Sequence, residues 1–393
     1  MVFSRFLAIR KLSFLSFFFV TTTMLIACQE TTDLISTSRP DNIKAVSVAL
    51  LVPKGSNKSG DDVIAESLEN SAQLAILESA ARGIQITLNV YPTERNPEIT
   101  KLQAIKAIEN GAQVILGPVF TETTRAASLA LSSSNVNILS FSNNANVAGG
   151  NVFILGPTFP NTANRLTAYA NSQGKRNIVI IHENSVAGQA GHHAIDTAAG
   201  SAGVNIVGSV TYQQTQTSVI SAVSEIEKVT TITNADVLFL TSTSSGALPL
   251  FAQLLPEVGV TSANVQYIGL TRWDIPVQTL ALSGIQHGWF ALPDPIFATN
   301  FQARYHDKFG ISPHPIGSLA YDGITAIHSL LESGANPRSK AALTQSAGFQ
   351  GATGLFRLLK DGTNERSLAV ATVQDKQVQV IDPAPRFFSN FDS

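Results

Sequence analysis

Polar side chains that follow two short apolar runs are the first candidates for chemistry in this sequence. The run Val114–Leu116 ends shortly before Thr121, and the run Val136–Leu139 is followed by Ser142 and Asn144. Hydroxyl and carboxamide groups bind small polar ligands, and no acid, base or nucleophile suited to catalysis lies among them. We therefore predict a ligand-binding site from Thr121, Ser142 and Asn144, with helix capping and turn formation as their alternative roles.

A second group of candidates follows the apolar run Val265–Leu270. It consists of Thr271, Arg272, Trp273 and Asp274. A tryptophan between opposite charges at the end of a strand is typical of a contact with a ligand or a partner protein. The same tryptophan could instead pack at a domain hinge while Arg272 pairs with Asp274. The sequence leaves both roles open.

Other motifs argue against enzymatic chemistry. The sequence contains no nucleophile elbow, and the glycine-rich stretch 55–60 lacks the lysine that a phosphate-binding loop places after its last glycine. His192 and His193 are adjacent and would point to different faces of a helix, so with His182 they do not have metal-ligand spacing. We expect no enzyme activity, no cofactor and no metal site.

The elements that must position these residues alternate regularly along the chain. The apolar run 45–52 is typical of a parallel strand buried on both faces, and amphipathic helical stretches separate it from the runs that follow. The same alternation returns after residue 150, which predicts two α/β lobes, each with a doubly wound parallel sheet. Ligands bind to such sheets at the carboxyl ends of the strands, where the polar candidates lie.

The first residues have the order of a bacterial secretion signal. Arg5, Arg10 and Lys11 precede the apolar run Leu12–Val20, which is too short for a good membrane-spanning helix. The tetrapeptide LIAC then resembles the lipobox of bacterial lipoproteins, in which Cys28 would become the lipidated first residue. An ordinary signal peptide and a membrane anchor are the alternatives. We predict a signal peptide over 1–27 and a flexible tether over 28–42.

Charge and cysteine content narrow the possible partners. Removal of the signal peptide takes three positive charges from a chain with 26 basic and 28 acidic residues, so the mature net charge is −5. This balance disfavours nucleic acids as partners. Cys28 is the single cysteine and therefore has no internal disulfide partner. Gln29, which follows it, resembles the pattern of lipoproteins that are sorted to the outer membrane.

Several stretches together resemble a known family. They are VALLVP, GAQVILGPV, NILSFSNN, NIVIIHENSVAGQAG, SLAYDGITAI and FQGATGLFRLLKDGTNERSLAV, and their order is similar to that in type I periplasmic binding proteins of the leucine/isoleucine/valine-receptor group. Within that group, GLTRWDIP, GWFALPDP and FQARYHDKFG resemble the penicillin-binding protein activator lipoproteins.

The resemblance implies two lobes joined by three crossovers, near Gly156, Gln286 and Gly348. Lobe 1 would comprise 43–156 and 287–347, lobe 2 would comprise 157–286 and 348–383, and 384–393 would form a tail. In amino-acid receptors of this group, hydroxyl and backbone amide groups of lobe 1 hold the ligand carboxylate. The matching positions in this sequence are Thr121, Ser142 and Asn144. Lobe 2 normally adds an aromatic residue and an acid, but the matching positions here are Ala187 and Thr271. An amino-acid ligand would then lack the anion that its ammonium group requires.

Two functions follow from these expectations. The first is a lipid-anchored binding module in the periplasm, on the outer membrane, that regulates a peptidoglycan synthase by contacting a class A penicillin-binding protein. The alternative is a substrate-binding lipoprotein that delivers an amino acid or another small polar solute to the permease of an ABC transporter.

Overall fold

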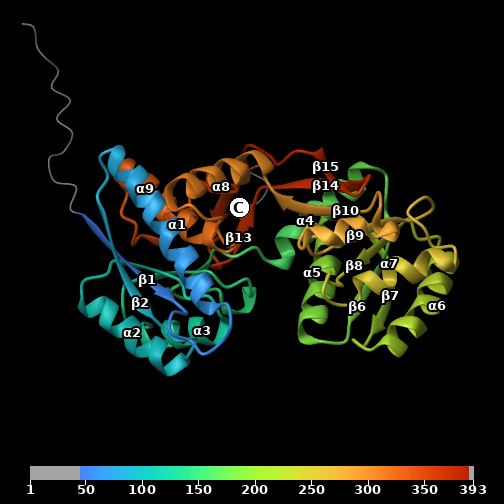
Figure 1. Ribbon diagram of the computed structural model, residues 1–393, viewed down its shortest axis with the longest axis horizontal. Helices are drawn as coiled ribbons and strands as arrows, with labels where there is room; N and C mark the ends of the chain where they lie inside the picture. The colour runs from blue at the N-terminus through green and yellow to red at the C-terminus, as the bar shows by residue number, and fades with distance from the viewer. Residues whose placement is uncertain (1–44, 389–393) are drawn as a thin grey trace, which may run out of the picture. The chain divides into compact units, whose positions relative to one another are not determined.

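The computed structural model describes residues 45–388, which form two large β-sheets and one small sheet, all covered by helices (Figure 1). Sheet A has the strand order β2-β1-β3-β4-β5, and all of its neighbouring strands run parallel. Its strands are β1 (Val46–Val52), β2 (Ile86–Pro92), β3 (Val114–Leu116), β4 (Asn137–Ser140) and β5 (Val152–Ile154).

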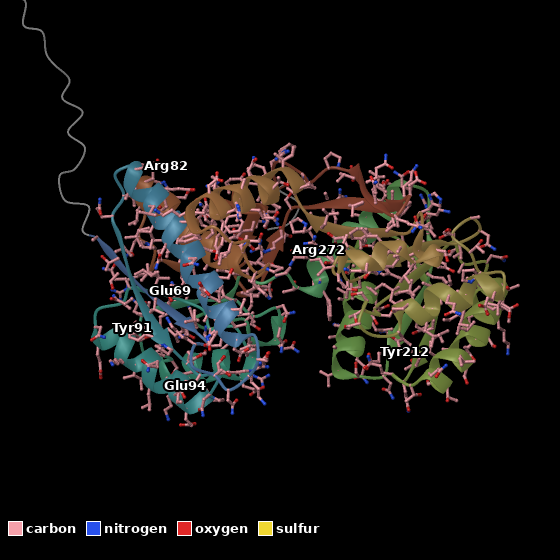
Figure 2. All side chains as sticks on the ribbon, viewed as in Figure 1. Glu69, Arg82, Tyr91, Glu94, Tyr212 and Arg272 are labelled. Atoms are coloured by element: carbon pink, nitrogen blue, oxygen red, sulfur yellow. The ribbon has the colours of Figure 1, made fainter. Side chains whose placement is uncertain are left out.

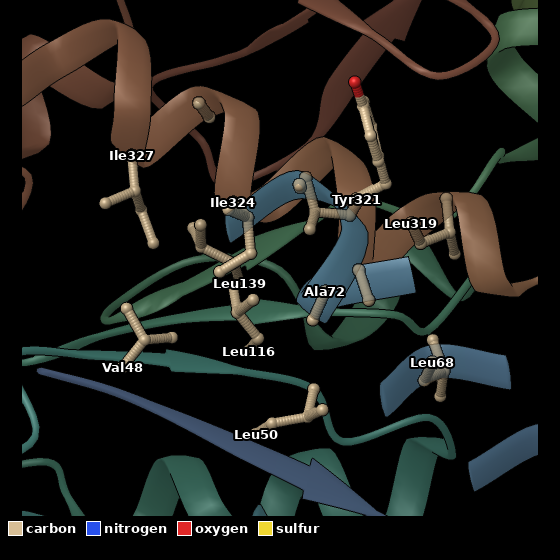
Figure 3. Close-up of a cluster of buried hydrophobic side chains, with 14 of the residues drawn as sticks. Val48, Leu50, Leu68, Ala72, Leu116, Leu139, Leu319, Tyr321, Ile324 and Ile327 are labelled. Atoms are coloured by element: carbon tan, nitrogen blue, oxygen red, sulfur yellow. The ribbon is translucent and has the colours of Figure 1, made fainter. Parts of the chain in front are cut away.

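Helices cover both faces of sheet A, which explains why its central strands β1 and β3 are almost entirely apolar. On one face, α1 (Asp61–Ala81) and α9 (Gly317–Glu332) pack together over the sheet; Figure 3 shows this core. Val48 and Leu50 of β1 point into it. On the other face, Ala49 and Leu51 meet α2 (Pro97–Glu109) and α3 (Thr121–Ala130). The apolar run 45–52 is therefore a strand that is buried on both faces.

Sheet B has the strand order β15-β14-β10-β9-β8-β6-β7. Strands β6 to β10 run parallel to one another. At one edge of the sheet, β14 runs antiparallel to β10, and β15 runs antiparallel to β14. Helices α4 and α5 cover one face, and α6 and α7 cover the other. The elements are α4 (Phe159–Ser172), β6 (Asn177–Glu183), α5 (Val186–Ala202), β7 (Asn205–Tyr212), α6 (Gln216–Thr233), β8 (Val237–Leu240), α7 (Leu248–Glu257), β9 (Gln266–Gly269), β10 (Trp289–Pro293), β14 (Leu368–Gln374) and β15 (Gln377–Asp382).

The remaining elements connect the two large sheets or cover them. The small antiparallel sheet has the order β11-β12-β13. In the described range 45–388, no helix is both long enough and apolar enough to span a lipid bilayer. The elements are η1 (Ala145–Val147), η2 (Val277–Ala281), η3 (Ser283–Ile285), α8 (Pro295–Phe309), α10 (Lys340–Leu343), β11 (Phe349–Gly351), β12 (Gly354–Leu358) and β13 (Asn364–Arg366).

The structure confirms the α/β class with doubly wound sheets but corrects two of the predicted boundaries. β10 pairs with β9 and β14, so the chain leaves sheet B after this strand and not near Gln286. Phe290 of β10 fills the core of sheet B. The third boundary is not at Gly348 either, because Phe356 of β12 packs in the core between sheet A and α9. The chain therefore rejoins sheet B only after Ser367.

A buried polar network ties the connecting segments together. Arg366 of β13 forms an ion pair with Asp322 of α9, with 2.8 Å between Nη2 and Oδ2. The same guanidinium donates to the carbonyl oxygen of Leu155, at 2.6 Å from Nη2. Asn364 donates to the carbonyl oxygen of Gly156 at 2.9 Å. Burial raises the pKa of the Asp322 carboxyl group, and the charge of Arg366 opposes this effect.

The C-terminal segment 383–388 leaves β15 and returns to elements outside sheet B. Arg386 forms an ion pair with Asp294, the N-cap of α8, with 3.0 Å between Nη1 and Oδ2. The guanidinium of Arg357 in β12 lies 4.8 Å from the ring centroid of Phe388. The segment thus joins the last strand of sheet B to α8 and β12. The predicted tail over 384–393 is ordered in this part, and its last five residues lie outside the described range.

Candidate functional site

The three residues predicted at the carboxyl edge of sheet A lie together. The carboxamide nitrogen of Asn144 donates to the hydroxyl oxygen of Thr121 at 3.2 Å. The backbone N–H of Asn144 donates to the hydroxyl oxygen of Ser142 at 3.1 Å. Ser142 is buried, whereas Thr121 and Asn144 are partly exposed. We call these three residues the edge A cluster.

A tight turn and a buried hydroxyl pair hold the edge A cluster in place. Gly117 follows β3 with φ of +85°, and a Cβ at this position would lie 2.3 Å from the carbonyl oxygen of Leu51. Only glycine fits there. After β4, the hydroxyl of Ser140 accepts from the backbone N–H of Ser142 at 3.1 Å and lies 2.8 Å from the hydroxyl of Thr124. Thr124 and Ser140 are not among the predicted site residues, and both are buried.

The N-terminus of α3 adds backbone donors beside the edge A cluster. Its N-cap, Phe120, has no side chain that could accept from the first N–H groups of the helix. Thr121 is the first residue of this ten-residue helix. Free N–H groups and the positive end of the helix dipole favour an anion. Together with the hydroxyls of Thr121 and Ser142, they can hold a carboxylate without any catalytic group.

The predicted charges at the carboxyl edge of sheet B satisfy each other. Nε of Arg272 donates to Oδ1 of Asp274 at 2.8 Å, and Nη2 makes a second hydrogen bond to Oδ2. The hydroxyl of Thr271 donates to the carbonyl oxygen of Ser242 at 3.2 Å. Arg272 and Tyr212 are labelled in Figure 2 on the part of the molecule that contains sheet B. Neither charge of the pair is free for a ligand unless the pair opens.

Trp273 lies in the core of sheet B and has no exposed surface. A Cβ at Gly269 would lie 2.3 Å from the indole ring, and a Cβ at Gly288 would lie 2.4 Å from it. The two glycines therefore make the space that the ring fills. Of the two roles left open by the sequence, packing is the one this position permits, because contact with a ligand would require the core to open.

Two further hydroxyl groups follow β8 and belong to the buried residues Thr241 and Ser242. The Ser242 hydroxyl interacts with the hydroxyl of Tyr212, whereas the Thr241 hydroxyl has no hydrogen-bond partner among residues 45–388. Buried polar atoms are normally paired, so the Thr241 hydroxyl is available to an ordered water or to a ligand. The sequence shows only a run of hydroxyl residues here, and such a run does not reveal which members are buried.

Ala187 and Thr271 occupy the two positions of lobe 2 where receptors of this group usually have an aromatic residue and an acid. Ala187 is exposed near the start of α5, and Thr271 carries no charge. Glu183 ends β6 opposite Tyr212 of β7 and forms no ion pair with any described residue. Burial raises the pKa of Tyr212, and the charge of Glu183 adds to this effect.

Two of the histidines, His182 near the end of β6 and His192 in α5, lie close together. The ring centroids of His182 and His192 are 4.6 Å apart, and Nε2 of His182 lies 3.0 Å from the hydroxyl oxygen of Thr211. Burial lowers the pKa of His182, and the charge of a protonated His192 lowers it further. Within 45–388, no group of three or more His, Cys, Asp and Glu residues is arranged to hold a metal ion.

Comparison with known proteins decides the family. A family model described as periplasmic binding protein matches residues 45–377. The chain belongs to the periplasmic binding protein family. This confirms the broader resemblance seen in the sequence and places the protein in a family of the periplasm. No curated protein sequence matches the chain. The narrower resemblance to penicillin-binding protein activators stays a prediction.

Solved structures share this fold of the family at low sequence identity. A branched-chain amino acid ABC transporter periplasmic ligand-binding protein from Burkholderia xenovorans is 15% identical, with a TM-score of 0.66, over 88% of this chain and 94% of that one. An ABC transporter substrate-binding protein from Desulfitobacterium hafniense in complex with Leu is 18% identical, with a TM-score of 0.63, over 86% and 100%. A solute-binding protein from Rhodopseudomonas palustris in complex with 3,4-dihydroxybenzoic acid is 16% identical, with a TM-score of 0.60, over 88% and 98%.

Proposed function

We propose that this protein is a non-enzymatic receptor that delivers a small carboxylate-bearing solute to an ABC transporter. The observation that carries the proposal is the edge A cluster at the N-terminus of α3. Its hydroxyl groups and the backbone N–H groups of the helix converge on one edge of sheet A, and none of them is a catalytic acid or base. The partner would be the transporter permease.

The ligands of proteins with a similar fold support the carboxylate. The structures from Desulfitobacterium hafniense and Rhodopseudomonas palustris were solved with Leu and with 3,4-dihydroxybenzoic acid, respectively. These molecules differ in size and polarity, and only leucine has an amino group, but both have a carboxylate. A site made of hydroxyl and amide donors recognises that shared group and does not require an ammonium group on the ligand.

Thermal unfolding in the presence of leucine, benzoate and 3,4-dihydroxybenzoate tests this proposal. A ligand at 100 times its Kd stabilises the protein by about 2.7 kcal/mol through mass action, and the melting temperature rises accordingly. Ser142→Ala and Thr121→Ala should weaken binding about tenfold each, because each removes a hydrogen bond to a charged group. Ser132→Ala, at an exposed serine outside the cluster, is the matched control.

The result that contradicts the receptor is equally specific. If neither these three monocarboxylates nor the dicarboxylates succinate and glutarate shift the melting temperature of the wild-type protein, the edge A cluster is not a site for carboxylate ligands. If a carboxylate binds the wild-type protein and both cluster variants with the same Kd, the ligand lies elsewhere.

A lipid anchor on Cys28 and location at the outer membrane form part of the same proposal. Both rest on the LIAC sequence and on Gln29, which lie outside the described residues. Mass spectrometry of the N-terminal peptide should show acyl chains on Cys28, and Cys28→Ser should release the protein from the membrane fraction. An unmodified N-terminus in the mature protein would contradict the anchor.

A second candidate function is regulation of a peptidoglycan synthase, the first of the two functions predicted from the sequence. One observation favours it. The stretch lies in the segment GLTRWDIP, which resembles the activator lipoproteins, and Arg272 keeps an exposed guanidinium beside Asp274. A pull-down with class A penicillin-binding proteins tests it, with Arg272→Ala as the variant. Capture that is absent, or unchanged by the variant, would count against a contact at this stretch.

A further inference from the structure

Arg95 is a cation at the carboxyl edge of sheet A that the proposed carboxylate site does not use. It follows β2, and its guanidinium carbon lies 3.8 Å from the ring centroid of Phe120. Phe120 immediately precedes Thr121 of the edge A cluster. Its neighbour Glu94 is labelled in Figure 2 on the part of the molecule that contains sheet A. The stacking on Phe120 places this guanidinium next to the N-terminus of α3.

A buried acid holds one corner of the Arg95 guanidinium. Asp61 is 2% exposed, and its Oδ1 lies 3.3 Å from Nη1 of Arg95. This is the only hydrogen bond of the Arg95 side chain to a residue of the described range. Nε and Nη2 are therefore free, and the side chain is 42% exposed. Oδ2 of Asp61 is buried and has no partner among the same residues, so a ligand would meet the donors of Arg95 and not this oxygen.

The backbone at Arg95 is fixed in a conformation that side chains rarely adopt. Glu94 and Arg95 have φ of +50° and +54°, and each such residue costs about 1–3 kcal/mol. Anchors on both sides hold the pair. The backbone N–H and the hydroxyl of Thr93 donate to the carbonyl oxygen of Val52 at 2.8 and 2.9 Å, respectively. Asn96 caps α2 and accepts from its N–H groups. Arg95 is thus oriented before any ligand arrives.

We propose that Arg95 binds a second anionic group of the ligand, so that the preferred solute is a small dianion such as a dicarboxylate. This inference rests on the proposed function, because the first carboxylate occupies the edge A cluster. A guanidinium presents two parallel N–H donors that match the oxygens of a carboxylate, and its charge strengthens both hydrogen bonds. A monocarboxylate needs only the hydroxyl and amide donors of the cluster. The free donors of Arg95 would then select for the second acidic group.

Calorimetric titration of the full mature chain tests this selection. The probes are succinate and glutarate as dicarboxylates, and benzoate and leucine as monocarboxylates. The wild-type protein should bind one of the dicarboxylates at least tenfold more tightly than either monocarboxylate. Arg95→Gln should abolish that preference and leave the affinity for monocarboxylates within twofold. Arg125→Gln is the matched control, because Arg125 lies on α3 and, among residues 45–388, pairs only with the exposed Glu122.

A purely structural role for Arg95, the neutralisation of Asp61, predicts a different result. Removal of the charge would then lower the melting temperature without changing the order of affinities. Arg95→Lys separates the two roles, since it keeps a cation near Asp61 but loses the planar pair of donors. Under our proposal this variant keeps its fold and still loses at least half of the preference, expressed as the logarithm of the affinity ratio.

Three outcomes would overturn the inference. A wild-type protein that binds monocarboxylates as tightly as dicarboxylates contradicts it and leaves the proposed function intact. A preference for dicarboxylates that survives in both Arg95→Gln and Arg95→Lys assigns the second group to another residue. If none of the four probes binds the wild-type protein, the carboxylate receptor and the dianion fail together.

Discussion

The carboxyl edges of the two large sheets begin with similar sequence patterns and end in different states. At sheet A, Ser142 and Asn144 hydrogen-bond within the edge A cluster, and the N-terminus of α3 lies uncapped beside it. At sheet B, Arg272 and Asp274 close on each other, and the aromatic ring between them points into the core. An apolar strand followed by polar residues therefore does not by itself make a binding surface. The difference is that uncapped backbone donors of α3 remain beside the edge A cluster, whereas the charges at the edge of sheet B pair with each other.

This difference predicts where substitutions act on stability and where they act on binding. At the carboxyl edge of sheet A, which we call edge A, hydrogen-bond donors remain available. The backbone there includes a turn at Gly117 that only glycine fits and two left-handed residues, Glu94 and Arg95. At the carboxyl edge of sheet B, which we call edge B, the Arg272–Asp274 pair and the buried ring of Trp273 stabilise the fold. The substitutions below test the comparison, from the largest expected effect to the smallest.

Trp273→Ala should destabilise the protein by about 3–5 kcal/mol, because it empties a fully buried aromatic site in the core of sheet B. Chemical denaturation measures the loss. Trp289→Ala is the control, since Trp289 is only partly buried and should cost less. An equal or smaller loss at Trp273 would show that this ring is not a core residue in solution, and the contrast between the two edges would fail.

Gly117→Ala should cost about 2 kcal/mol or more beyond Gly111→Ala, as measured by the free energy of unfolding. The two glycines have nearly the same φ, +85° and +84°, so the backbone penalty is shared. A Cβ at Gly117 would collide with the carbonyl oxygen of Leu51, whereas nothing lies within 4 Å of one at Gly111. Equal costs would mean that the turn beside edge A relaxes easily.

Arg272 and Asp274 should be coupled by about 1 kcal/mol in a double-mutant cycle of Arg272→Ala and Asp274→Ala. The pair is partly exposed and has two hydrogen bonds. The coupling should fall as salt is added, because ions screen exposed charges. Additive effects of the two substitutions would show that the charges at edge B are free, as they would be at a binding surface.

The smallest expected effect concerns pH at edge B. The folded state holds the pKa of His182 below the ordinary value of about 6.5, chiefly through burial, and the unfolded chain has that ordinary value. The unfolded state therefore binds more protons as the pH falls through 6.5, and the free energy of unfolding decreases. His182→Asn should flatten this dependence between pH 7 and pH 5.5, as measured by chemical denaturation at several pH values. An unchanged slope would exclude His182 as its source.

The sequence predicts the edge A cluster because the ends of apolar runs mark the ends of strands. Thr121 begins the helix that follows β3, and Ser142 follows β4. These two strands are parallel neighbours, so the proximity of the two residues follows from the alternation of strands and helices. Arg95 could not be found in this way. Its role depends on a left-handed backbone and on Asp61, which precedes it by 34 residues, and no local pattern indicates either.

The errors in the predicted boundaries have a physical origin as well. β10 and β12 are short strands, and their sequences do not indicate whether they pack in the core of sheet A or in that of sheet B. Phe290 belongs to the core of sheet B and Phe356 to that of sheet A, and both assignments depend on partners distant in sequence. Trp273 was ambiguous for the same reason, since its burial depends on space left by Gly269 and Gly288.

The C-terminal segment 383–388 has a consequence for how the molecule opens locally. An edge strand near the end of a chain normally frays from its free end. Here the residues that follow β15 contact elements outside the sheet: Arg386 forms an ion pair with Asp294, and the Phe388 ring packs against Arg357. We therefore expect β15 to open first at its other end, the turn between β14 and β15, so that amide protons near this turn exchange faster than those near Asp382.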